Sequence, residues 1–261
     1  MFRLLLFVVC LFLVPWLLAF VLPSPAPTLR SFLATFIPVV WSPTLLALVF
    51  LGAEGGPSSV ARELRARLQI RRGYRGWLAA AVIIPVVAVA IGLVVTRAAG
   101  DAAPFIPLSA LATTVLIQVV TGALGEELGW RGYMLSRLEP LVGSFAAVWI
   151  MGVLWSSWHI GAFFNPSLPH YHISMVAMLP FIAFFGVFLG TIFFRAGNSV
   201  LATMAAHLAF NILIAIGGAV ITSSILWATL SLVFALIAVP FSLSLRRVAI
   251  ALTSVATASP T

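Results

Sequence analysis

Long apolar runs alternate with short polar breaks along the whole chain. An α-helix needs roughly 20 apolar residues to cross a bilayer, whereas a barrel strand needs about ten residues of alternating pattern. Most runs here are of the helical kind, and the breaks contain turn-forming residues, as in "PSPAPT" at 23–28 and "RAGN" at 195–198. The pattern predicts eight spans, at 4–22, 32–52, 77–96, 106–136, 141–164, 173–194, 199–217 and 223–245.

Composition supports this interpretation. The chain is 62% hydrophobic and 8% charged, whereas a soluble domain is typically about 25% charged. Because so few polar residues cannot cover a globule in water, lipid must be the main solvent. We therefore expect an all-α polytopic membrane protein, a bundle of about eight transmembrane helices. It should form a single integral-membrane domain over residues 1–261, with a mobile tail at 248–261.

The arginines indicate the topology. All 14 basic residues are Arg. Arg131 lies inside a predicted span. If the N-terminus is cytoplasmic, eleven of the remaining thirteen lie on the cytoplasmic side, and only Arg30 and Arg97 lie outside. Such a bias follows the positive-inside rule, so both termini are expected to be cytoplasmic. Basic loops of this kind account for the net charge without a nucleic-acid partner. The small size and the absence of lysine favour the plasma membrane of a bacterium.

Six of the arginines gather in the connection between the second and third spans, at 62–75. Arginines spaced along such a segment suit an interfacial helix on anionic lipid headgroups. We expect this segment to anchor and orient the protein on the cytoplasmic surface.

A few ionisable residues fall inside predicted spans, where such residues usually mark function. They are Glu126, Glu127, Arg131, His159 and His207, and Asn211 accompanies them. We counted their depth from the expected cytoplasmic ends of the helices at about 1.5 Å per residue. Glu126 and His207 lie at similar depth, and His159 lies about 8 Å deeper. We expect spans four, five and seven to bring them together in a polar cavity within the membrane.

Helical spacing divides the carboxylates between two roles. Glu127 and Arg131 are four residues apart and can form an ion pair on one helix face. Glu126 is rotated by about 100° from its neighbour and is left as the free carboxylate. The alternative is that all three form a salt-bridge cluster at the interface.

The histidines have polar or aromatic companions at helical spacing. His207 and Asn211 share a face, from which both can donate hydrogen bonds to a developing oxyanion. Trp155 lies one turn before His159 and can hold its ring. The simpler interpretation of either histidine alone is a hydrogen-bonded packing residue.

Other polar residues receive structural interpretations. Glu54, Glu63, Asp101 and Glu139 are expected to be solvated, and His170 and His172 to be residues of an outer loop.

Glycines near the candidate site would let helices approach closely; they are Gly122, Gly125, Gly129 and Gly132. Gly186 and Gly190 form a G-x-x-x-G pattern that we assign to internal packing.

Three short motifs carry a resemblance to a known family. "EELGWR", "WSSWH" and "HLAFN" resemble, in the same order, the EExxxR, FxxxH and HxxxN signatures of the CPBP family of intramembrane proteases, also called Abi or CAAX-protease-like. Trp155 stands where the second signature usually has Phe. The resemblance covers residues 105–217.

The resemblance implies a protease and a role for each matched residue. Glu126 and His159 would activate a water molecule, and His207 and Asn211 would stabilise the oxyanion, with Glu127 and Arg131 in support. The family is often labelled metalloprotease, and Glu126, His159 and His207 would be the ligands of a zinc ion. Because these residues come one per helix, without compact H-E-x-x-H spacing, a metal-free site is favoured and zinc stays an alternative.

The leading function is therefore an intramembrane endopeptidase that cuts a membrane-associated protein or peptide. A non-catalytic membrane immunity or scaffold protein is an alternative, although it would not need the complete motif set. A small transporter with Glu126 in a proton relay is less favoured, because no internal repeat is evident.

Overall fold

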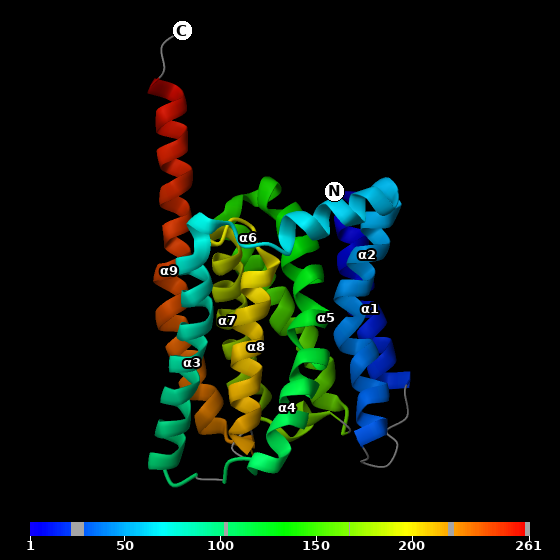
Figure 1. Ribbon diagram of the computed structural model, residues 1–261, viewed down its shortest axis with the longest axis vertical. Coiled ribbons are helices and arrows are strands. Elements are labelled where there is room, and N and C mark those ends of the chain that lie inside the picture. The colour runs from blue at the N-terminus through cyan, green and yellow to red at the C-terminus, as the bar shows by residue number, and fades with distance from the viewer. Residues whose placement is uncertain (22–28, 102–103, 167, 219–221, 259–261) are drawn as a thin grey trace.

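The computed structural model describes residues 1–21, 29–101, 104–166, 168–218 and 222–258. These residues contain helices and connections and no strand, which confirms the all-α class (Figure 1). The helices are α1 (Phe2–Val21), α2 (Leu29–Arg67), η1 (Arg72–Tyr74), α3 (Arg75–Ala98), α4 (Leu108–Thr121), α5 (Ala123–Glu127), η2 (Leu128–Leu135), α6 (Ser136–Trp158), η3 (His159–Phe164), η4 (Pro169–His172), α7 (Met175–Arg195), α8 (Val200–Ile216) and α9 (Ser224–Ala258).

Within the part of the chain that the structure describes, five stretches are long and apolar enough to cross a membrane, which makes the chain a polytopic membrane protein. They are Phe36–Arg67, Arg72–Ala98, Leu108–Phe164, Met175–Arg195 and Ser224–Arg246, and Phe2–Leu18 and Val200–Ile216 are shorter apolar helices. The third stretch reverses direction at Gly143, whose φ of 78° is not helical, so it contains two of the predicted spans. The number of membrane crossings stays a prediction.

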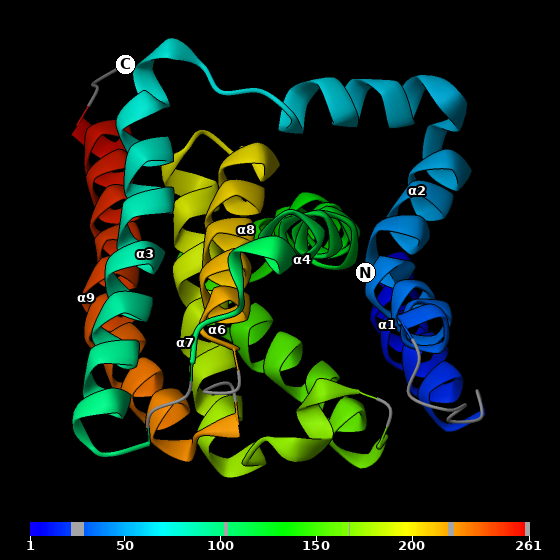
Figure 2. The same ribbon diagram turned by 60° about the horizontal axis from the view of Figure 1, so that its bottom comes forward.

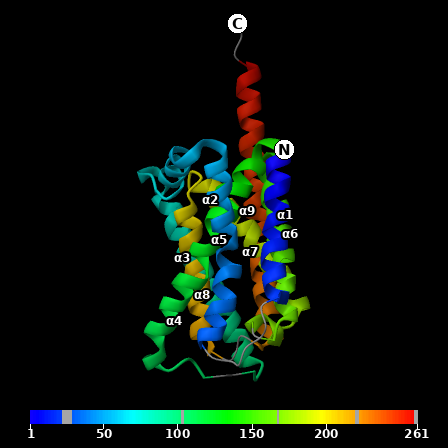
Figure 3. The same cartoon turned by 90° about the vertical axis from the view of Figure 1, so that its right-hand side faces the viewer.

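The basic segment lies across one end of the bundle. The chain bends at Gly55 and Gly56, where φ of 68° at Gly56 departs from the helix. Beyond this bend the second half of α2 runs across the bundle towards α3 (Figures 1 and 2). The start of α1 and the end of α9 lie at this same end (Figures 1 and 3), as an even number of crossings requires.

Glu54 corrects one prediction, because it is not simply solvated. Its carboxylate accepts a hydrogen bond of 2.7 Å from the Tyr133 hydroxyl and forms an ion pair with Arg137. This contact joins the bend in α2 to the region where η2 passes into α6. The sequence offered no sign of it, since the partners lie 79 and 83 residues away.

The predicted fourth span is not one continuous helix. It is divided at Gly122 into α4 and α5, and the π-helical turns of η2 follow. The break frees backbone carbonyls of α4, and Trp41 of α2 donates a hydrogen bond of 2.7 Å from its indole nitrogen to the Val120 carbonyl. π-Helical segments occur frequently at functional sites, and this one carries Arg131.

Glycines let α2 lie directly against this broken helix. A Cβ added to Gly125 would lie 2.7 Å from the Val40 carbonyl oxygen, and one added to Gly129 would lie 2.3 Å from that of Pro43. These positions are confirmed as sites of close helix approach. On α7, a Cβ at Gly186 would lie 2.9 Å from the Gly152 Cα, so the G-x-x-x-G pattern packs inside the bundle.

Helix α7 is the centre of the packed core between α6, α8 and α9. Phe181 and Phe185 stack on one another with ring centroids 5.5 Å apart, and Phe210 of α8 and Phe234 of α9 pack against them. Offset and edge-on aromatic pairs of this kind add about 0.5–1.5 kcal/mol each beyond their buried area. The core thus holds α8 in a fixed position relative to α6 and α7.

Helix α1 is attached to the end of α6 by an exchange of indole hydrogen bonds. Pro15 has no N–H group for the Leu11 carbonyl, which instead accepts a hydrogen bond of 3.0 Å from the Trp158 indole. Trp16 donates in return to the Trp158 carbonyl at 3.1 Å. The arrangement fixes the last turn of α6, which carries Trp155.

The last helix is longer than predicted. Helix α9 continues to Ala258, past the expected end of the final span at 245, and it projects beyond the bundle (Figure 3). Side chains from 247 onwards lie outside the described residues, so the mobility of the tail at 248–261 stays a prediction.

Candidate active site

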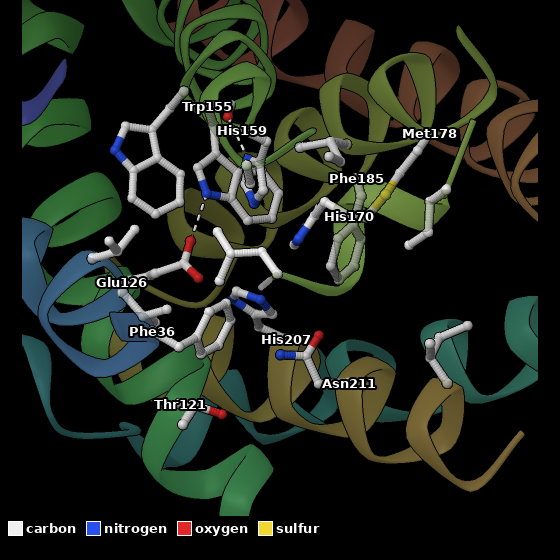
Figure 4. Close-up of a pocket in the computed structure, with 18 of the residues that line it drawn as sticks. Phe36, Thr121, Glu126, Trp155, His159, His170, Met178, Phe185, His207 and Asn211 are labelled. Carbon is white, nitrogen blue, oxygen red and sulfur yellow. Dashed lines mark hydrogen bonds between the residues drawn. The ribbon is translucent and has the colours of Figure 1, made fainter. Parts of the chain in front are cut away.

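Polar side chains from several helices line one cavity of about 200 Å³ inside the bundle (Figure 4). Glu126 comes from α5, Trp155 from the last turn of α6, His159 from the start of η3, and His207 and Asn211 from α8. Most of the remaining lining is apolar. The structure therefore brings together the four residues predicted to carry the chemistry.

Glu126 faces the cavity. The residue is buried, with only 5% of its surface exposed to solvent. The Oε2 atom accepts a hydrogen bond of 2.7 Å from the Trp155 indole nitrogen. This bond fixes the carboxylate, and Oε1 is left for a ligand in the cavity.

Glu127 is not among the residues that line the cavity, and its carboxylate binds side chains of the surrounding helices. Its Oε1 atom accepts hydrogen bonds of 2.8 Å from Arg131 Nη1 and of 2.8 Å from His207 Nδ1. The ion pair with Arg131 was predicted from spacing. The bond to His207 was not predicted, and it gives Glu127 a second role. Because the carboxylate accepts a hydrogen bond from Nδ1, it fixes the histidine ring and leaves Nε2 free.

His159 is oriented in a similar way. Its Nδ1 atom lies 2.8 Å from the Trp155 carbonyl oxygen, so Nδ1 carries the hydrogen and Nε2 is left with a lone pair. Span five was predicted to continue as a helix to 164, but α6 ends at Trp158 and a 3₁₀ segment begins. Trp155, one turn before His159, is the residue that contacts Glu126.

Trp155 contacts Glu126, both histidines of the predicted site and Arg131. Its ring centroid lies 5.2 Å from that of His159 and 5.4 Å from that of His207, edge-on in both cases. The Arg131 guanidinium lies over its ring at 4.5 Å, a favourable cation–π distance. A phenylalanine could provide these ring contacts, but it has no N–H group to donate to Glu126.

Asn211 is placed by the helix break at Gly122. A Cβ on this glycine would lie 2.6 Å from the Asn211 Nδ2 atom. The absence of a side chain thus lets the carboxamide lie between α4 and α8 at the edge of the cavity, one turn after His207.

His170 corrects the assignment of its loop as purely structural. It lies on η4, and its ring lines the cavity 5.7 Å from the ring of His159. Burial lowers the pKa of His170 to about 4, so the imidazole is neutral near pH 7. The sequence signal was weak: apolar Leu168 and Ile173 flank it and indicate that part of the loop turns inward.

The donor types resemble a zinc site, but the distances do not. In both His159 and His207 the Nδ1 atom donates a hydrogen bond to an oxygen atom, which is the usual second-sphere arrangement of a zinc-bound histidine. Among the residues that the structure describes, however, no three His, Cys, Asp or Glu side chains are close enough to share an ion. The side chains as the structure places them do not fit a zinc ion, and the metal-free site stays a prediction.

The fold and the site define a polytopic membrane protein with a Glu–His–His–Asn cluster around a cavity inside its helix bundle. Comparison with known proteins agrees with this class. Residues 107–213 match the family described as Rce1-like, type II CAAX prenyl endopeptidase. CAAX prenyl protease 2 of Methanococcus maripaludis is 37% identical over 59 residues, which are 23% of this chain and 22% of that protein.

These matches confirm the resemblance to the CPBP, or CAAX-protease-like, family that the three motifs indicated. The family match contains α4, α5, η2, α6, α7 and most of α8, the elements that hold the cavity. The chain matches less than a quarter of the length of this relative. The role of each residue in the site stays a prediction.

Proposed function

We propose that this chain is an intramembrane endopeptidase that hydrolyses a peptide bond of a membrane-associated protein or peptide. The observation that carries the proposal is the convergence of Glu126, His159, His207 and Asn211 on one cavity with an apolar lining. Water activation and oxyanion stabilisation are the two requirements of peptide hydrolysis, and the cavity offers groups for both.

Glu126 and His159 would activate the water. The Nε2 lone pair of His159 accepts one hydrogen of the water, and Glu126 takes the other as the oxygen attacks the carbonyl carbon. When the C–N bond breaks, Glu126 returns this proton to the leaving amine. The Trp155 hydrogen bond at 2.7 Å keeps one carboxylate oxygen fixed so that the other faces the water.

His207 and Asn211 would stabilise the oxyanion. Because Nδ1 of His207 donates to Glu127 at 2.8 Å, a donor to the oxyanion must be a second proton on Nε2. The Glu127 carboxylate would lie beside the imidazolium that this step needs, as the triad aspartate lies beside its histidine. We thus assign to Glu127 the role of supporting His207 as well as pairing with Arg131.

A prenylated protein with a C-terminal CAAX sequence is the substrate class that we propose to examine first. The matched family and the matched relative are both named for it. The cavity also has an apolar side lined by aromatic residues, among them Phe181, Phe210 and Trp227, which suits an apolar group beside the scissile bond.

We also propose that the Arg-rich segment at 62–75 binds anionic headgroups at a cytoplasmic membrane surface. Its first part forms the helical half of α2 that lies across the end of the bundle (Figure 2). Several of its arginines are exposed there, including Arg62, Arg65, Arg71 and Arg72.

The test is cleavage of a prenylated CAAX peptide by the purified protein in detergent, followed by mass spectrometry of the products. We expect cleavage by the wild type and its loss in Glu126→Ala and His207→Ala. Cleavage at the same rate by these variants would refute the assignment. Adding and removing zinc in the same assay tests the metal-free expectation, and activity that needs zinc would contradict it.

A further inference from the structure

His170 is a polar group of the cavity that the proposed mechanism does not use. The loop that carries it folds back on itself: Tyr171 N donates to the Leu168 carbonyl at 3.1 Å, and Ile173 N donates to the His170 carbonyl at 3.0 Å. Leu168 and Ile173 are buried, whereas Tyr171 and His172 are exposed. The loop thus presents His170 to the cavity and its neighbours to the outside.

Its imidazole lies where a ligand would pass. Figure 4 shows the ring projecting into the cavity near His159 and Phe185, on the side away from Glu126. The rings of His159 and Phe163 are 5.7 Å and 5.5 Å from it. These aromatic contacts hold the ring in place without using either nitrogen.

One of the two ring nitrogens of His170 is not satisfied by the protein. His170 Nδ1 is buried and has no hydrogen-bond partner among the residues that the structure describes. A buried polar atom without a partner costs free energy and calls for an explanation, such as a ligand or water at that point. His159 and His207, in contrast, both have Nδ1 hydrogen-bonded within the protein.

A neutral imidazole offers one donor and one acceptor, as a peptide group does. A peptide in the cavity would bring main-chain groups on both sides of the scissile bond into an apolar surrounding, where unpaired amides are costly. Glu126, His207 and Asn211 would engage the scissile group itself. Among the described residues that line the cavity there is no Arg or Lys to bind a charged group near His170.

We propose that His170 binds the main chain of the substrate, through a hydrogen bond to a peptide group next to the scissile bond, and so positions that bond against Glu126. This assignment rests on the proposed endopeptidase function. It makes the loop between α6 and α7 part of the substrate-binding site.

The test measures binding separately from cleavage. A fluorescent prenylated CAAX peptide is titrated against the Glu126→Gln protein, with and without a change at His170, and KM and kcat are measured in the otherwise wild-type protein. His170→Phe keeps an aromatic ring and removes both nitrogens. His170→Asn keeps a donor and an acceptor near the place of Nδ1. His172→Phe is the matched control, because it lies in the same 3₁₀ turn and is exposed.

We expect His170→Phe to weaken peptide binding about tenfold, the effect of one lost hydrogen bond, and to raise KM with kcat changed by less than about twofold. His170→Asn should restore most of the affinity, and His172→Phe should have none of these effects. Unfolding temperatures show that each variant is folded.

Unchanged affinity in His170→Phe would overturn the assignment, as would equal losses in His170→Phe and His170→Asn. The two hypotheses fail in different ways. If the wild type cleaves the peptide but binding does not depend on His170, only the proposed role of His170 is contradicted. His170-dependent binding without cleavage by the wild type would contradict the protease assignment and support His170 as a binding residue.

Discussion

Two adjacent glutamates have different surroundings although they are one residue apart. Glu126 faces the cavity and has one hydrogen bond, from Trp155. Glu127 is fully buried and accepts from both Arg131 and His207. The 100° rotation between neighbouring helical residues separates a group that can react from a group that holds its surroundings together.

Local spacing predicted one half of this arrangement. The pair of Glu127 and Arg131 follows from four residues of helix, which fixes their relative position. The bond between Glu127 and His207 joins residues 80 apart in the sequence, and the indole bond from Trp155 to Glu126 joins residues 29 apart. Such contacts depend on how helices pack, which the spacing within any one helix does not determine.

Trp155→Phe tests the indole hydrogen bond to Glu126. The substitution keeps an aromatic ring against both histidines and removes the donor, so we expect peptide cleavage to fall about tenfold, as for a lost bond to a charged group, with little change in unfolding temperature. Trp149→Phe is the control, because this indole donates to Ser242 at 3.2 Å outside the cavity. Equal activity of Trp155→Phe and wild type would show that Glu126 does not need the indole.

At the scale of elements, the site depends on breaks in helices. Helix α4 ends at Thr121, Gly122 leaves room for Asn211, and α6 gives way to η3 at His159. The hydropathy pattern predicted continuous spans here because it reports which residues are apolar and says little about hydrogen-bond register. The inward turn of His170 was missed for a related reason: loop conformation depends on a few buried contacts, here Leu168 and Ile173.

Gly129→Ala tests the close approach of α2 to η2. The added methyl group would lie 2.3 Å from the Pro43 carbonyl oxygen, so backbone must move, and we expect a loss of about 3 kcal/mol in the free energy of unfolding. Thermal unfolding in detergent measures it. The control is Gly52→Ala on α2, where nothing lies within 4 Å of the added atom. Equal unfolding temperatures of the two variants would contradict the close packing.

At the scale of the whole molecule, the apolar pattern predicted the class of fold well. The all-α bundle and the common end of the two termini follow from runs of apolar residues and from the arginines. The second half of α2, which carries three of these arginines, lies at the end of the bundle that holds both termini (Figure 1). Which end faces the cytoplasm depends on the membrane, and it stays a prediction.

Cysteine labelling tests this orientation. Cys10 is the one cysteine of the chain, so Cys10→Ala gives a background without thiols. In it, we place single cysteines at Gln69, beside the Arg-rich helix, and at Asp101, between α3 and α4; both positions are exposed. A membrane-impermeant maleimide should label Asp101→Cys in intact bacterial cells and Gln69→Cys only after permeabilisation. The opposite pattern would reverse the topology.

The central claim is that one glutamate reacts and its neighbour supports the site. The measurement that tests it most directly compares Glu126→Gln with Glu127→Gln for both peptide cleavage and thermal unfolding. Glu126→Gln should lower cleavage by about 10²–10⁴-fold, as expected for loss of a general base, and unfold near the wild-type temperature. Glu127→Gln should unfold at a clearly lower temperature, because it leaves Arg131 as an uncompensated buried charge. Full cleavage by Glu126→Gln, or unchanged unfolding of Glu127→Gln, would contradict this division.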